Sequence, residues 1–177
     1  MAQIIFDHVT KQYKNEVALK DISFTVDKGE FVFIVGKSGA GKSTLLNLIM
    51  KQEEVTSGQI IVEGRRLDTM DRKRVPMHRR RLGIMSPEVG LLKDRSIYDN
   101  IRLAILATGN ADERIRSKVI KVLGLVGLAG KYHAYPDELS GGEQARVLLS
   151  RALAVKPEIL IADELPANLV PDSAWDL

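Results

Sequence analysis

The sequence predicts an α/β domain with an antiparallel strand-rich part and a helical insertion. A glycine-rich segment, residues 36–44, lies between an apolar run typical of a buried strand and a run typical of a helix. Towards the other end of the chain, a helical pattern again leads into a short apolar run, residues 159–162. Helices that alternate with buried strands in this way are typical of α/β domains.

Length and composition indicate an ordinary globular protein. The chain has 177 residues, enough for one domain with a sizeable core, so we expect residues 1–177 to form a single domain. The absence of cysteine excludes disulfides, thiolate metal sites and cysteine nucleophiles, and is compatible with a reducing cytosol. No apolar run approaches the roughly 18 residues of a membrane span, and the N-terminus lacks the pattern of a signal peptide.

The strands are expected mainly before and around the glycine-rich segment. The run at residues 18–26 alternates apolar and polar residues imperfectly, which is typical of a strand at the edge of a sheet. The run at residues 31–35 is apolar and rich in β-branched and aromatic residues, which predicts a buried strand leading into the glycines. Further strands are expected at residues 4–9, 58–64, 82–85 and 159–162.

The middle of the chain has helical periodicity. Apolar residues recur at helical spacing in residues 96–106 and 111–126, so a helical subdomain is expected at about residues 88–140. A further helix begins after Ser140, which forms an S-x-x-E capping box with Glu143. Pro157 marks the end of that helix.

The glycine-rich segment fits the phosphate-loop pattern G-x-x-x-x-G-K-[ST]. Its glycines allow a tight turn that brings backbone N–H groups close to phosphate oxygens, and the helix N-terminus adds partial positive charge. Lys42 would contact the β- and γ-phosphates, and the Ser43 hydroxyl would bind Mg²⁺. The alternative is a glycine-rich turn that matches by chance. The candidate binding residues are Gly36, Ser38, Gly39, Ala40, Gly41, Lys42, Ser43 and Thr44.

Two carboxylates follow the run at residues 159–162. Asp163 is suited to bind the same Mg²⁺ as Ser43, and Glu164 is suited to orient or deprotonate an attacking water. The alternative is a solvated strand end, which is less favoured in a chain that also has a phosphate loop.

A second anion site is predicted at Ser140, Gly141, Gly142 and Glu143. A serine hydroxyl and glycine N–H groups at a capped helix N-terminus suit a γ-phosphate. The alternative is plain helix capping. Capping does not explain two consecutive glycines in a first turn, where they weaken the helix.

Together these motifs resemble those of the ATP-binding cassette (ABC) ATPases. Residues 36–43 resemble the Walker A motif, residues 139–144 the LSGGQ-type signature, and residues 159–164 the Walker B strand with its catalytic glutamate, Glu164. The resemblance implies a P-loop NTPase fold with an antiparallel β subdomain and a helical signature subdomain, and it implies ATP and Mg²⁺ as ligands. Tyr13 resembles the aromatic residue that stacks on adenine in this family, although on position alone it could equally be an ordinary surface tyrosine.

Within the family, residues 29–33 running into residues 36–44, together with residues 79–83 and 94–100, resemble the FtsE group of bacterial cell-division ATPases. The likeness covers essentially all 177 residues. This resemblance implies a head-to-tail homodimer on ATP binding, an FtsX-like integral membrane partner and a peripheral location on the cytoplasmic side of the plasma membrane. Lipoprotein-release and macrolide-export ATPases look similar and remain alternatives. A DNA-repair cassette is disfavoured because residues 44–138 show no sustained heptads.

The chain departs from the family pattern in four ways. Pro87 stands where a glutamine is expected, and its side chain can neither bind Mg²⁺ nor hydrogen-bond to water. Residues 165–167 replace a proline followed by threonine or serine, and Val170 replaces an aspartate. The chain ends at Leu177, before the histidine that contacts the γ-phosphate in this family, so a C-terminally truncated cassette is expected.

These departures affect turnover groups more than binding groups. We therefore hypothesise that the chain binds Mg-ATP but hydrolyses it slowly or not at all, which leaves a non-catalytic ATP-binding module as an alternative function.

A basic cluster follows the strand expected at residues 58–64. It is either a solvated face or a contact for the anionic inner leaflet of the membrane or for an acidic loop of a partner. Nucleic-acid binding fits less well because the cluster lacks interleaved aromatic residues. Its members are Arg65, Arg66, Arg72, Lys73, Arg74, Arg79, Arg80 and Arg81.

Overall fold

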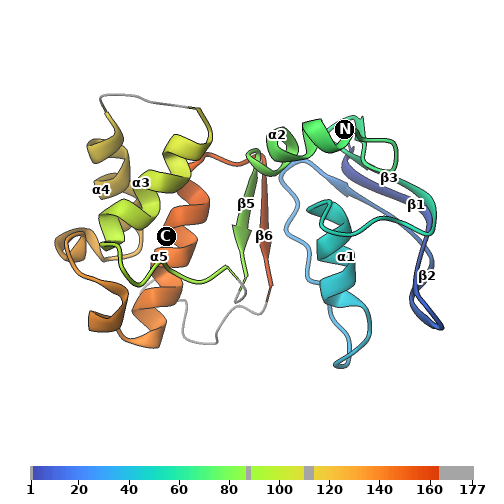
Figure 1. Ribbon diagram of the computed structural model, residues 1–177, viewed down its shortest axis with the longest axis horizontal. Helices are drawn as coiled ribbons and strands as arrows, with labels where there is room; N and C mark the ends of the chain where they lie inside the picture. Colours follow the sequence, from blue (N-terminus) through green and yellow to red (C-terminus); the bar gives the residue numbers. More distant parts are fainter. Residues whose placement is uncertain (1, 87–88, 110–113, 164–177) are drawn as a thin grey trace. The chain divides into compact units, whose positions relative to one another are not determined.

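The computed structural model describes residues 2–86, 89–109 and 114–163 (Figure 1). The chain divides into two compact units, Met1–Arg79 and Arg80–Leu177, and each is described by itself. The expectations for Pro87, Glu164, Val170 and residues 165–167 lie outside the described residues.

The first unit is built on a four-stranded sheet with the strand order β2-β1-β3-β4. A long hairpin, β1 (Ala2–Tyr13) and β2 (Glu16–Asp27), forms one side of the sheet, and β3 (Ser57–Val62) pairs antiparallel with β1. The short strand β4 (Arg65–Arg66) completes the sheet. Both hairpin strands are longer than expected, and β2 lies at the edge, as its imperfect alternation predicts.

Apolar residues on one face of this sheet form the core of the first unit. Ile4, Phe6 and Val9 of β1 are buried, as are Ile60 and Val62 of β3. Helix α1 (Lys42–Ile49) follows the glycine-rich segment and buries its leucines and Ile49. At the end of the unit, the 3₁₀ turn η1 (Arg72–Arg74) leads directly into the short helix α2 (Val75–Arg79).

The prediction of a buried strand at residues 31–35 is wrong in this structure. The segment forms no strand, and its apolar side chains are exposed, with Phe31 79% and Phe33 77% accessible. A strand needs a neighbour to pair with its N–H and C=O groups, and the sheet of this unit is made by β1, β2, β3 and β4. Local apolar pattern alone therefore does not make the segment a strand here.

The second unit contains a parallel pair of strands and a group of helices. β5 (Leu82–Met85) pairs with β6 (Ile159–Ala162), in the register Leu82↔Ile159 to Met85↔Ala162. Both strands coincide with the sequence prediction. The expected burial of β6 is only partly correct, because Ile161 is buried whereas Leu160 is 45% exposed.

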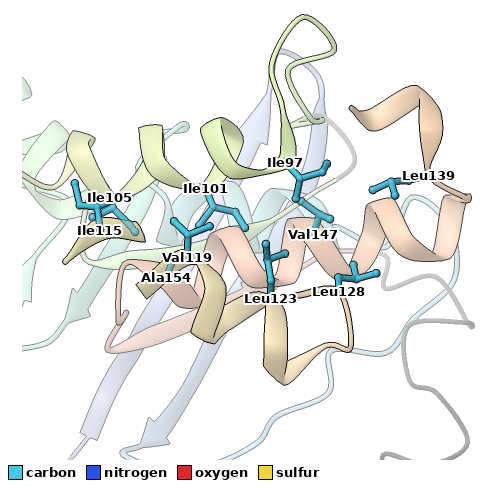
Figure 2. Packing of buried hydrophobic residues seen from close by; sticks show 10 residues of the cluster. All are labelled: Ile97, Ile101, Ile105, Ile115, Val119, Leu123, Leu128, Leu139, Val147 and Ala154. Atoms are coloured by element: carbon cyan, nitrogen blue, oxygen red, sulfur yellow. The ribbon is translucent and has the colours of Figure 1, made fainter. Parts of the chain in front are cut away.

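Three helices carry most of the core of the second unit. These are α3 (Ile97–Ala107), α4 (Ile115–Leu125) and α5 (Gly141–Ala154), with the 3₁₀ turns η2 (Ala129–Lys131) and η3 (Pro136–Glu138) between α4 and α5. Figure 2 shows their buried side chains meeting in one cluster, which includes Ile101, Val119, Leu123 and Val147. Helix α5 thus contributes to the core of the predicted helical region. None of the helices in the described part of the chain has the length and apolarity needed to cross a membrane.

Candidate nucleotide-phosphate site

The phosphate loop contains two glycines with left-handed backbone conformations. Gly39 has a φ of 79° and Gly41, which precedes α1, has a φ of 86°. A Cβ atom at Gly41 would lie 2.4 Å from the Ala18 carbonyl oxygen and 2.8 Å from Leu19 Cδ2. Gly41 is therefore required for two reasons, because of its φ and because of its close approach to β2.

Lys42 lies at the centre of this loop. Its Nζ donates to the carbonyl oxygens of Gly36 and Lys37, each at 2.9 Å. The Ala40 N–H donates to the same Lys37 carbonyl at 3.1 Å, which closes the turn. The loop therefore folds around the ammonium group of Lys42, and Ser38 and Ala40 are exposed.

The N-terminus of α1 has backbone donors that face away from the helix ladder. The first helical bond in this turn runs from the Leu45 N–H to the Gly41 carbonyl, at 2.9 Å. The N–H groups of Lys42, Ser43 and Thr44 precede that bond, and no side chain caps them at Gly41. Such a terminus favours an anion through both its free donors and the helix dipole.

The capping box at the start of α5 is confirmed. Ser140 Oγ accepts a bond from the Glu143 N–H at 3.3 Å, and Glu143 Oε2 accepts from the Ser140 N–H at 2.9 Å. The Ser140 hydroxyl also donates to Glu143 Oε2, at 3.0 Å. A Cβ atom at Gly141 would meet nothing within 4 Å, so the first turn is open at that position.

A lysine that the sequence reasoning missed lies beside this capping box. Lys131 Nζ donates to Glu143 Oε1 at 2.5 Å. This bond to Lys131, together with those from Ser140, lowers the pKa of Glu143 to about 2. Lys131 precedes Glu143 by a turn and a loop, and no local pattern in the sequence indicates that the two side chains meet.

Asp163 directly follows β6, and its N–H donates to the Met85 carbonyl at 2.8 Å. The carboxylate therefore stands at the C-terminal end of the parallel strand pair, where the sequence predicts it. Across residues 2–86, 89–109 and 114–163, no three side chains of the types His, Cys, Asp and Glu gather into a metal-binding group.

Tyr13, at the end of β1, is 38% exposed, and its ring contacts the buried ammonium group of Lys11. Lys11 Nζ lies 4.6 Å from the centre of the Tyr13 ring. The same ammonium donates to Glu53 Oε2 at 2.8 Å and to the Glu54 carbonyl at 2.9 Å. Its charge is thus compensated within the first unit. Sequence reasoning missed Lys11 because its partners lie 42 and 43 positions away.

Some arginines of the basic cluster act inside their own unit. Arg66 pairs with Asp68, and Arg65 lies 3.8 Å from a Glu63 carboxylate oxygen. Arg79 donates to the carbonyls of Met50 and Lys51, at 2.9 and 2.7 Å. These contacts favour a structural role for part of the cluster, while residues 72–74 of η1 are exposed.

Comparison with known protein families explains why these motifs occur together in one chain. The model of the ABC transporter family matches residues 19–167. This chain belongs to the ABC transporter family. It is an ATP-binding cassette with the ABC ATPase fold, so the fold class predicted from the motifs is confirmed.

Within the ABC family, this chain is similar to cell division ATP-binding proteins named FtsE. The cell division ATP-binding protein FtsE of Mycobacterium tuberculosis is 43% identical over 176 residues, which cover 98% of this chain and 76% of that protein. FtsE of Bacillus subtilis is 41% identical over 170 residues, covering 96% and 75%. The solved dimer of the ATP-binding cassette MJ0796, in a post-hydrolysis state bound to ADP and Pi, has a TM-score of 0.86 at 29% identity and covers 98% of this chain and 78% of that one.

Proposed function

We propose that this chain is the ATP-binding and ATP-hydrolysing subunit of a membrane-associated complex of the FtsE type. The observation that carries the proposal is the loop of residues 36–44, folded around Lys42 at an uncapped helix N-terminus. Its relatives are named cell division ATP-binding proteins, and the solved MJ0796 cassette holds ADP and Pi. The nucleotide cycle would be coupled to a membrane partner in cell division.

The loop supplies the groups that a triphosphate needs. We propose that Lys42 exchanges its bonds to the Gly36 and Lys37 carbonyls for bonds to the β- and γ-phosphates. The N–H groups at the start of α1 would bind the same oxygens, and the exposed Tyr13 ring would stack on adenine.

We propose that a hydroxyl and a carboxylate, those of Ser43 and Asp163, bind Mg²⁺ together with the phosphates. Ser43, at the start of α1, and Asp163, after β6, supply the hard oxygen donors that this ion prefers. They number too few for a protein-only cage, as expected for an ion held largely by phosphates and water. When bound, the ion would neutralise charge on the phosphates, and Glu164 would orient or deprotonate the attacking water.

Within one copy of the chain, we assign no nucleotide-binding role to the signature at Ser140, Gly141, Gly142 and Glu143. We propose that it contacts the γ-phosphate held by a second copy, in a head-to-tail homodimer with residues 1–177 forming one ABC ATPase domain per copy. The helical subdomain, at about residues 88–140 together with α5, would carry the signature. An FtsX-like integral membrane subunit would hold the pair at the cytoplasmic face of the plasma membrane.

Separate measurements of ATP binding and ATP turnover test this proposal. Mg-ATP binding should be lost in Lys42→Ala and retained in Lys37→Ala, because Lys37 contributes only its backbone carbonyl to the loop. Turnover should be low and should disappear in Glu164→Gln. Binding that is unaffected by Lys42→Ala would reject the site. Binding without any turnover in the unmutated chain would favour the non-catalytic module that Pro87 and Val170 suggest.

Anionic lipid contact is proposed for the exposed residues Arg72, Lys73 and Arg74 of η1. Charge reversal at these three positions should weaken binding to vesicles that contain phosphatidylglycerol. Arg79 is unsuitable for this test because it bonds to the end of α1. Vesicle binding that survives the reversal would eliminate the contact.

A further inference from the structure

The signature of this chain contains a carboxylate close to the position proposed for a triphosphate. Glu143 lies in the first turn of α5, three residues after Ser140, and its side chain is 17% exposed. A negative charge at this position opposes the approach of a γ-phosphate, because like charges repel most strongly where water is partly excluded. The signature therefore needs a means of compensating this charge.

Lys131 of η2 provides that compensation. Its Nζ donates to Glu143 Oε1 at 2.5 Å, while Glu143 Oε2 accepts from the N–H and hydroxyl of Ser140. Both carboxylate oxygens are thus engaged, and the charge of Glu143 is paired. The low pKa of Glu143 is a consequence of the same contacts, so the carboxylate remains ionised at all physiological pH values.

The contacts also fix the geometry of the serine. Ser140 is the N-cap of α5, and Glu143 holds it from both the N–H and the hydroxyl side. If Glu143 turned away, the hydroxyl would lose the acceptor that orients it. Lys131 lies in η2, outside α5. It therefore influences the orientation of Ser140 indirectly, by holding Glu143.

We propose that Lys131 is a positioning residue of the signature, which neutralises and holds Glu143 so that Ser140 and the first turn of α5 can accept a phosphate of a nucleotide bound by a second copy of this chain. The inference rests on the proposed function, because it requires the signature to meet a nucleotide. A surface ion pair of this exposure contributes little to stability, so its importance would appear in dimerisation and only weakly in folding.

A double-mutant cycle on ATP-driven dimerisation tests the inference. The dimer dissociation constant is measured by sedimentation with saturating Mg-ATP, in a Glu164→Gln background that removes turnover. Lys131→Met should weaken the dimer about tenfold, which corresponds to about 1.4 kcal/mol, whereas Lys131→Arg should retain it. In a Glu143→Gln chain there is no charge to neutralise, so adding Lys131→Met should have little further effect.

Salt dependence supplies a readout that a merely structural contact would not change. In Lys131→Met the unpaired carboxylate repels the phosphate, so raising the ionic strength should strengthen the dimer of this variant relative to the unmutated chain. Lys121→Met, an exposed lysine of α4 with the same change in net charge, is the control and should leave the dimer unchanged. Thermal unfolding of each variant detects any loss of folding.

Three outcomes separate the possibilities. Dimerisation of Lys131→Met at the level of the unmutated chain would overturn the inference. An equal loss in the Glu143→Gln background would also overturn it, since Lys131 would then act independently of Glu143. The absence of any ATP-driven dimer in the unmutated chain would instead reject the proposed function, and the inference with it, while intact Mg-ATP binding to the monomer would still support the phosphate loop.

Discussion

At the scale of single residues, the phosphate loop depends on two positions that favour glycine. Gly39 and Gly41 share the left-handed conformation, with φ values of 79° and 86°, but only Gly41 is crowded by a neighbouring strand. The need for glycine at position 41 could be predicted, because the phosphate-loop pattern is a spacing of residues close together in the sequence. The crowding by Ala18 could not be predicted, because it depends on how β2 runs past the loop.

Alanine substitution at these two glycines separates strain from crowding. Gly39→Ala should lower the free energy of unfolding by about 1–2 kcal/mol, which is the cost of the left-handed conformation for a residue with a Cβ atom. Gly41→Ala adds a contact of 2.4 Å with backbone, so it should cost about 2 kcal/mol more. Urea denaturation of both variants checks the difference. Equal losses would mean that β2 moves aside freely.

The Lys11 ammonium lies 4.6 Å from the centre of the Tyr13 ring, which we propose stacks on adenine. Lys11→Met should weaken ATP binding about three- to tenfold, in line with a partly buried cation–π contact of about 1 kcal/mol. Binding of inorganic tripolyphosphate should not change, because it has no base to stack on Tyr13. Lys20→Met, an exposed lysine of β2, is the matched control. Equal losses for both ligands would argue against Tyr13 as the adenine contact.

At the scale of elements, α1 is fixed at both ends. The loop closes its N-terminus, and residues of α2 bind its C-terminal carbonyls, since His78 Nε2 lies 2.7 Å from the Ile49 carbonyl and Arg79 bonds to the next two carbonyls. The loop at the N-terminus follows from the motif. The contacts at the C-terminus join residues 28 or 29 positions apart, which no local pattern reveals.

His78 makes the stability of this arrangement depend on pH. It is 2% exposed, and Nδ1 has no hydrogen-bond partner. Burial lowers the pKa of His78 below its usual value, outweighing the Ile49 carbonyl and Glu63, which raise it, while Arg65 and Arg79 lower it further. The unfolded chain therefore takes up this proton first as the pH falls below about 6.5, which disfavours the folded state.

His78→Gln keeps a donor for the Ile49 carbonyl but does not titrate. The difference in unfolding free energy between the unmutated chain and this variant should be constant above about pH 7 and should shift in favour of the variant towards pH 5. The pKa of His8 is raised, mainly by its hydrogen bond to Asp21, but His8 is present in both chains, so its contribution cancels in the difference. Urea denaturation at pH 8 and pH 5 measures the difference, and the same value at both pH values would contradict a neutral, buried His78.

The exposed segment at residues 31–35 shows where local pattern and observed structure disagree. Its composition indicates a buried strand, but strand formation depends on a partner that composition does not specify. The Phe31 and Phe33 rings contact each other edge to face, with centroids 4.9 Å apart, and both remain largely exposed. By contrast, β2 and the α5 capping box could be predicted because alternation and capping are local.

Replacing both rings distinguishes the exposed state from a buried strand. Phe31→Ser combined with Phe33→Ser should reduce the fluorescence of a bound hydrophobic dye, because exposed apolar area is removed. The midpoint of thermal unfolding should stay nearly unchanged. A fall in that midpoint by several degrees, as expected when buried aromatic residues are truncated, would show that the segment is buried in solution.

At the scale of the whole molecule, the motifs are divided between two units. The phosphate loop and Tyr13 belong to Met1–Arg79, whereas the signature and Asp163 belong to Arg80–Leu177. The type of fold could be predicted because each motif has a local physical signal. The pairing of charges such as Lys131 with Glu143 could not, because it depends on tertiary packing within a unit.

We propose that the phosphate loop of one copy and the signature of another form one nucleotide site. Mixing two defective chains tests it most directly. Lys42→Ala removes the loop cation, and Gly141→Asp adds a negative charge at an open position that tolerates a side chain. In a head-to-tail pair, one of the two sites then has both intact halves.

The measurement is sedimentation of the two variants, alone and mixed, with Mg-ATP in the Glu164→Gln background. We expect neither variant to dimerise alone and the equimolar mixture to form a heterodimer with one occupied site. A mixture that stays monomeric while the unmutated chain dimerises, or a Gly141→Asp chain that dimerises fully by itself, would contradict the claim.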